Sequence, residues 1–164
     1  MYYKPGSGKT RVPYAAAVEE ALCFGWIDST ANKLDEFRSI QYFAPPKAKS
    51  NWSRINKQRV DQLVGDGRMQ PPGMAVIETA KANGSWDALN EVEDLMIPAD
   101  LQKLFAKNRK AHQYFMAFPN SSKKIILYWI MSAKTEATRS KRLAETVRLA
   151  ALNERANHYQ PKKS

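Results

Sequence analysis

Prolines and glycines divide most of this chain into segments with the periodicity of α-helices. After Pro46, apolar residues recur three and four positions apart between successive breaks, as they do on one face of a helix. The longest uninterrupted apolar run, residues 125–131, is far shorter than the roughly 20 residues that cross a bilayer. The pattern therefore predicts no membrane span and helices over residues 52–64, 73–83, 123–133 and 136–152. Between residues 83 and 123 it predicts one helix that starts at Pro98 and a next helix that Pro119 ends.

The first 46 residues carry the signals of strands. Tyr2-Tyr3 precedes a Pro-Gly turn, and two β-prone runs, residues 26–29 and 37–43, flank a polar connection. A further helix is expected over residues 14–24, where Gly25 would end it. The predicted fold class is α+β, mostly helical, with a small antiparallel sheet near the N-terminus, in a single domain over residues 1–164.

Basic residues are concentrated in the last third of the chain. The net charge of the chain is +10, and residues 101–164 hold fourteen basic and three acidic side chains. Such a field attracts polyanions such as nucleic acid, but it also serves for solubility, and both interpretations stay open. The start of the chain shows no apolar leader and Cys23 is the sole cysteine, so we expect a cytoplasmic protein without disulfides.

No motif in the chain predicts a catalytic centre. Residues 6–10, Gly-Ser-Gly-Lys-Thr, lack the first glycine of a phosphate loop, since Tyr3 stands there, and they are expected to form a turn. Cys23 is interpreted as a buried structural thiol. Asn120 or Ser121 is expected to cap the helix over residues 123–133, which is apolar almost all round and predicted to be central and buried. We expect no enzyme, no metal and no cofactor.

Two features suggest an anion or ligand site. Arg139 borders the apolar stripe of the last helix, so its guanidinium needs either a carboxylate, with Asp28 as first choice, or a bound anion. Basic residues also flank the helix N-terminus near residues 47–54. Trp26 and Trp52 are each expected in the core. The residues of the predicted site are Trp26, Asp28, Ser50, Trp52, Arg139 and Arg142.

A nucleic-acid interface is the alternative partner hypothesis. No base-reading motif is visible, so binding would rest on phosphate contacts and would be sensitive to salt. It requires the basic residues to lie on one face of the fold. The residues expected to make these contacts are Lys103, Lys107, Arg109, Lys110, Lys123, Lys124, Lys141 and Arg148.

Several blocks of the chain resemble the bacterial YdeI/OmpD-associated family, whose members are called bacteriocin-protection proteins. The blocks are residues 21–29 with Gly-Trp-Ile-Asp, residues 49–53 with Ser-Asn-Trp-Ser, Asn56, Arg59, Glu78, Ala80-Lys81, residues 133–134 and residues 138–142. The resemblance extends over nearly the whole chain, and residues 97–152 resemble the family's C-terminal helical module. It implies a non-enzymatic role in stress response and antimicrobial peptide tolerance, and it assigns no catalytic residue. A chain of net charge +10 does not attract cationic peptides, so we expect the protection to be indirect.

Overall fold

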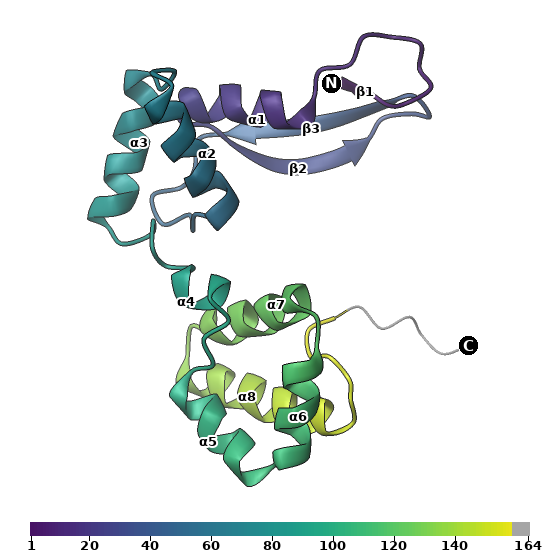
Figure 1. Cartoon of the computed structure of the whole chain (residues 1–164), viewed down its shortest axis with the longest axis vertical. Coiled ribbons are helices and arrows are strands. Elements are labelled where there is room, and N and C mark those ends of the chain that lie inside the picture. The colour runs from purple at the N-terminus through teal and green to yellow at the C-terminus, as the bar shows by residue number, and fades with distance from the viewer. Residues whose placement is uncertain (159–164) are drawn as a thin grey trace. The chain divides into compact units, whose positions relative to one another are not determined.

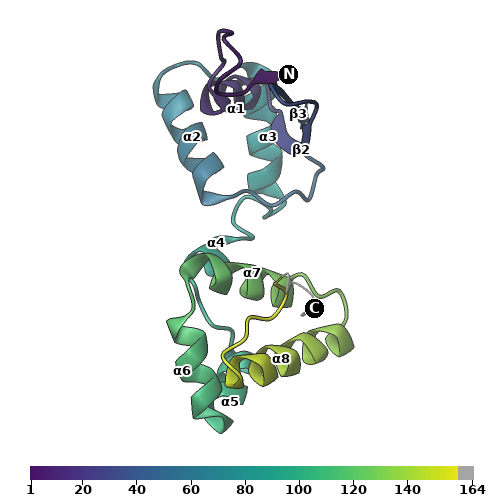
Figure 2. The same cartoon turned by 90° about the vertical axis from the view of Figure 1, so that its right-hand side faces the viewer.

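The computed structural model describes residues 1–158 and divides the chain into two compact units, Met1–Leu89 and Asn90–Ser164. Figures 1 and 2 show the helices and strands of each unit. Each unit has its own hydrophobic core. The architecture is α+β and mostly helical, as predicted, with a three-stranded antiparallel sheet near the N-terminus. The single domain over residues 1–164 stays a prediction.

The predicted hairpin is confirmed in the N-terminal unit. Strands β2 (Ile27–Lys33) and β3 (Arg38–Ala44) pair antiparallel, and β1 (Tyr2–Tyr3) adds to the other edge of β3 in the order β1-β3-β2. A register shift between Asp28 and Ala31 lets β2 continue beyond the predicted residue 29. The turn is closed by Asp35, whose carboxylate accepts from the Phe37 amide at 2.9 Å and from the Arg38 guanidinium at 2.6 Å.

Three helices complete the N-terminal unit: α1 (Tyr14–Cys23), α2 (Arg54–Gly65) and α3 (Pro71–Ala82). The side chain of Ser53 caps α2 by accepting from the Asn56 amide. The end of α1 lies against the start of α3, because a Cβ placed on Gly73 would come within 2.3 Å of the Cys23 carbonyl oxygen. Glycine is therefore required for this helix contact.

The N-terminal core contains Trp52, as predicted, but not Trp26. Trp52 is 4% exposed and packs against Trp86 with 5.1 Å between ring centroids. Trp26 is 46% exposed, so its assignment to the core was wrong. Ile27, its neighbour, packs against the core, and successive side chains of extended backbone point to opposite faces. Cys23 is buried as expected, and burial raises the pKa of its thiol.

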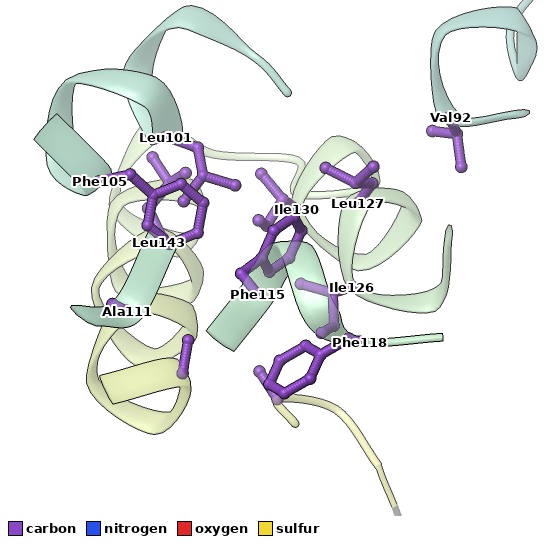
Figure 3. Packing of buried hydrophobic residues seen from close by; sticks show 12 residues of the cluster. Val92, Leu101, Phe105, Ala111, Phe115, Phe118, Ile126, Leu127, Ile130 and Leu143 are labelled. Atoms are coloured by element: carbon purple, nitrogen blue, oxygen red, sulfur yellow. The ribbon is translucent and has the colours of Figure 1, made fainter. Parts of the chain in front are cut away.

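The C-terminal unit consists of helices in the part of the chain that the structure describes. They are α4 (Asn90–Glu93), which the sequence did not predict, α5 (Ala99–Lys107), α6 (Arg109–Ala117), α7 (Asn120–Met131) and α8 (Glu136–Ala151). α8 contacts α5, α6 and α7. Figure 3 shows Phe115 at the centre of this core, with Leu101, Phe105, Ile126 and Ile130 around it.

Helix α7 begins earlier than predicted and is not buried all round. Its N-cap is Pro119, with no side-chain cap, so the capping role expected for Asn120 or Ser121 was wrong. A proline already lacks the amide hydrogen and holds the φ that a helix start needs. Lys123 is 9% exposed and donates through Nζ to the Met116 carbonyl at 3.2 Å, while Ile125 and Tyr128 are more than 40% exposed. None of the helices in residues 1–158 is long and apolar enough to cross a membrane.

Candidate functional site

The six residues of the predicted site fall in both units. Trp26, Asp28, Ser50 and Trp52 belong to Met1–Leu89, whereas Arg139 and Arg142 belong to Asn90–Ser164. Each part is therefore described within its own unit.

Arg139 forms a structural ion pair, but with a different carboxylate from the one predicted. Its Nε lies 2.6 Å from Oδ2 of Asp100, in the first turn of α5, and this contact lowers the pKa of Asp100. The Arg139 side chain is 26% exposed, which makes it half-buried. The prediction that Asp28 is the partner of Arg139 was wrong. The sequence indicates where Arg139 lies on α8, but it does not indicate which helix packs against that position.

Asp28 instead accepts a hydrogen bond from a tyrosine of its own unit. The Tyr14 hydroxyl donates to Oδ2 of Asp28 at 2.5 Å, and this bond raises the pKa of Tyr14 to about 12. Because deprotonation would remove the donated hydrogen, the phenol stays protonated at neutral pH. The pair fastens α1 to β2.

The segment around Ser50 and Trp52 borders a small pocket of about 180 Å³ against α3. Its lining includes Lys47, Trp52, Thr79 and Ser85. The Ser50 amide donates to the Lys47 carbonyl at 2.8 Å, and the Thr79 and Ser85 hydroxyls donate to backbone carbonyls of α3. These bonds lie within the loop or at α3 itself, and the loop is joined to the end of α3 by the Asn83 side-chain amide, which donates to the Ala48 carbonyl at 2.5 Å.

Trp26 lies in an open apolar groove along α1. The groove has a volume of about 520 Å³, and Phe24 and Trp26 in its wall are each about half exposed. The groove was not predicted from the sequence, because apolar residues were expected to face the core. Its lining residues are Val12, Ala16, Ala17, Glu20, Ala21, Phe24, Trp26 and Phe43.

Arg142 is held in place on the surface of the C-terminal unit. Its guanidinium lies 5.2 Å from the ring of Trp129, and Nη1 donates to the Trp129 carbonyl and, at 3.1 Å, to the Ser132 hydroxyl. Within residues 1–158, Nε and Nη2 of Arg142 have no hydrogen-bond partner. Because the guanidinium of such an arginine is already fixed, binding a ligand to its free edge costs little further side-chain entropy.

Arg142 borders a pocket of about 440 Å³, whose other lining residues are Trp129, Thr138, Lys141 and Glu145. Glu145 is paired with Arg148 through two bonds of 2.9 and 2.8 Å, which lower the pKa of its carboxyl, and the charge of Lys141 adds to this effect. In the described part of the chain, the Lys141 ammonium has no hydrogen bond or ion pair within reach. Arg142 was predicted as a site residue from the sequence, but Trp129 was not. The only sequence feature of Trp129 is its position in an apolar helix, which does not indicate a site.

Three of the eight basic residues proposed for nucleic acid are engaged within the fold. Lys123 is buried, Lys124 pairs with Glu93 at 2.5 Å and Arg148 pairs with Glu145. The remaining five lie on α5, α6 and α8: Lys103, Lys107, Arg109, Lys110 and Lys141. A metal site has no support in residues 1–158, where no three His, Cys, Asp or Glu side chains are grouped to hold an ion.

Comparison with known proteins separates the two halves of the chain. Residues 1–76 match a domain of unknown function (DUF8412), and this segment contains the Gly-Trp-Ile-Asp and Ser-Asn-Trp-Ser blocks. No curated protein and no solved structure matches the chain. Residues 94–153 match the family described as bacteriocin-protection, YdeI or OmpD-associated, a range that encloses the predicted module of residues 97–152. The resemblance to the bacteriocin-protection family is therefore confirmed over residues 94–153, the segment that contains Trp129 and Arg142.

Proposed function

We propose that this chain is a cytosolic, non-enzymatic protein that supports tolerance of bacteriocins and related stress indirectly, by binding an anionic ligand through its C-terminal unit. The observation that carries the proposal is the guanidinium of Arg142, fixed on Trp129 with free donors beside Lys141.

The electrostatics of the pocket favour an anion. Lys141 and Arg142 contribute two positive charges to the lining. The negative charge of Glu145 is paired with Arg148, which lies outside the lining. The Asn90–Ser164 unit as a whole has 14 basic and 7 acidic side chains, so its long-range field has the same sign. Such a site has no attraction for a cationic peptide, which fits a protective effect exerted through another ligand.

A complementation experiment tests the role in tolerance. A bacterial strain lacking this chain would receive the wild type, Arg142→Gln or Lys134→Gln and then be challenged with a bacteriocin. Lys134 is a suitable control because it is an exposed basic residue of the same unit, lies outside the pocket lining and has no ion pair in the described structure. We expect the wild type and Lys134→Gln to restore survival and Arg142→Gln to fail at equal protein level. Full protection by Arg142→Gln would overturn the proposal.

The proposed location is tested by cell fractionation of the same strain. A tagged full-length chain should appear in the cytosolic fraction together with a cytosolic marker protein. Recovery with the membranes or in the periplasm would contradict this part of the proposal.

Nucleic-acid binding is a second candidate, favoured by five basic residues of α5, α6 and α8 that form no ion pair within residues 1–158. If all five contact phosphates of duplex DNA, the logarithm of affinity should fall with the logarithm of salt with a slope of about −4.5. Fluorescence anisotropy at two salt concentrations measures this slope, and Lys103→Glu with Lys107→Glu should reduce it. Absence of binding at low salt would remove this candidate.

A further inference from the structure

The geometry points to a phosphate monoester of a small organic molecule as the ligand of the pocket at Trp129, Thr138, Lys141 and Arg142. This inference rests on the proposed function, since it names the ligand class of the same site.

Charge matching separates a phosphate monoester from other anions. The cations of the lining are Lys141 and Arg142. The charge of the lining carboxylate, Glu145, is balanced by Arg148 outside the lining, so two positive charges remain. A phosphate monoester carries about −1.5 to −2 at pH 7. A carboxylate or a phosphodiester carries only −1, so either would leave one cation of the pocket without a counter-charge. The monoester is the anion that the pocket neutralises most completely.

The hydrogen-bond donors of the pocket suit a group with several oxygens. Nη1 of Arg142 is held by the Trp129 carbonyl and the Ser132 hydroxyl, which leaves Nε and Nη2 on the same edge of the guanidinium. Two parallel N–H groups of this kind bind two oxygens of one phosphate. The Thr138 hydroxyl oxygen accepts from the Thr135 hydroxyl at 2.9 Å, so its own hydrogen remains available to donate. With the Lys141 ammonium, the lining offers donors to all three terminal oxygens.

The volume and the aromatic wall of the pocket indicate a ligand larger than inorganic phosphate. About 440 Å³ is within the range of pockets that hold small organic molecules. The indole of Trp129 forms one wall and offers apolar contact to the organic part of a ligand. A phosphorylated metabolite with a planar or apolar group would use both the cations and the ring.

The indole N–H signal of Trp129 in NMR spectra of the full chain reports on this pocket. Trp129→Phe assigns the signal, since the other tryptophans all belong to Met1–Leu89. The probes, at constant ionic strength, are adenosine monophosphate, inorganic phosphate, dimethyl phosphate and acetate. We expect adenosine monophosphate to bind most tightly and to outcompete dimethyl phosphate and acetate by at least about tenfold, because it engages an additional charge-assisted contact. Its affinity should fall between pH 8 and pH 5, as the phosphate gains its second proton near pH 6.

Variants identify the residues that bind. Lys141→Gln and Arg142→Gln should each weaken binding of adenosine monophosphate about tenfold or more, whereas Lys134→Gln should leave it unchanged. Lys141 has no contact in the described structure that folding depends on, so Lys141→Gln keeps the test valid even if Arg142→Gln loosens the segment between α7 and α8.

The possible failures are distinguishable. If dimethyl phosphate or acetate binds as tightly as adenosine monophosphate, and Arg142→Gln abolishes this binding, the pocket holds anions but the monoester inference is overturned. If no anion moves the Trp129 signal, the proposed function falls as well.

Discussion

The two units of this chain differ in where they place their aromatic side chains. In the C-terminal unit Phe105, Phe115 and Phe118 are buried together with ring centroids 5.0 to 6.1 Å apart. The N-terminal unit has about half or more of each of five aromatic side chains exposed: Tyr14, Phe24, Trp26, Phe37 and Tyr42. Both units have buried aromatic rings, since Trp52 and Trp86 are buried in the N-terminal unit, but the N-terminal unit exposes more of its aromatic side chains.

The sheet explains much of this difference. Figure 1 shows the distal end of the β2–β3 hairpin extending past α1, so helices cover only part of the sheet within this unit. Along β2 the burial changes from half-buried residues at Ile27 to exposed ones from Ser29 onward. In the C-terminal unit α5, α6 and α7 all contact α8, which leaves the large rings enclosed. An aromatic residue is buried only where a second element lies over it.

The largest effect is expected from replacing the same residue type in each unit. Phe115→Ala removes a ring that is 0% exposed and should lower the free energy of unfolding by about 3–5 kcal/mol. Phe24→Ala removes a ring that is 49% exposed and should cost about 1 kcal/mol or less. Chemical denaturation of both variants measures the difference. Equal losses would mean that the contrast between the units is not energetic.

A smaller effect is expected where the N-terminal unit is packed most tightly. Gly73→Ala places a methyl group against the Cys23 carbonyl between α1 and α3, and it should destabilise the chain by about 1–3 kcal/mol. Gly65→Ala is the matched control, because nothing lies within 4 Å of the added methyl group at the end of α2. That variant should be neutral or slightly stabilising. Thermal melts in which both variants lose the same stability would refute the close helix contact.

The smallest effect concerns the ion pair of the C-terminal unit. Asp100→Asn should cost about 0.5–1 kcal/mol at pH 7, since Asp100 and Arg139 are both partly exposed to solvent. Arg139 lowers the folded-state pKa of Asp100 below its usual value, so the stabilisation is complete above the unfolded-state pKa and is lost as the pH falls through the folded-state pKa. Melting temperatures of wild type and variant should therefore differ at pH 7 and converge near pH 2. A difference that persists at pH 2 would assign the effect to packing.

Local signals in the sequence predicted most of the elements correctly. Prolines and glycines mark both limits of α3, the start of α5 and the end of α6, and the β-prone runs mark β2 and β3, because these signals act within a few residues. α4 was not predicted, because a helix of four residues is too short to show a helical periodicity of apolar residues. The length of β2 was missed because its continuation depends on pairing with β3 across a register shift.

The candidate site was less predictable than the fold, for reasons of long-range geometry. Helical periodicity placed Arg139 at the edge of the buried stripe of α8 and Arg142 just beyond it. It could not predict their contacts with Asp100 and Trp129, because these residues belong to other helices. Trp26 was assigned to the core from its apolar neighbours, whereas its exposure depends on which face of the sheet the helices cover. Thr146, 1% exposed, was not predicted as a core residue because threonine is polar. Its hydroxyl donates to the Arg142 carbonyl within α8, which satisfies the polar group in the core.

Calorimetric titration with adenosine monophosphate tests most directly whether ligand binding resides in the C-terminal unit. The variants to compare are Arg142→Gln, in the cationic pocket, and Trp26→Ala, in the apolar groove of the other unit. We expect Trp26→Ala to bind adenosine monophosphate with the affinity of the wild type. Arg142→Gln should bind it at least about tenfold more weakly. Loss of binding in Trp26→Ala with wild-type affinity in Arg142→Gln would contradict the account and place the site in the N-terminal groove.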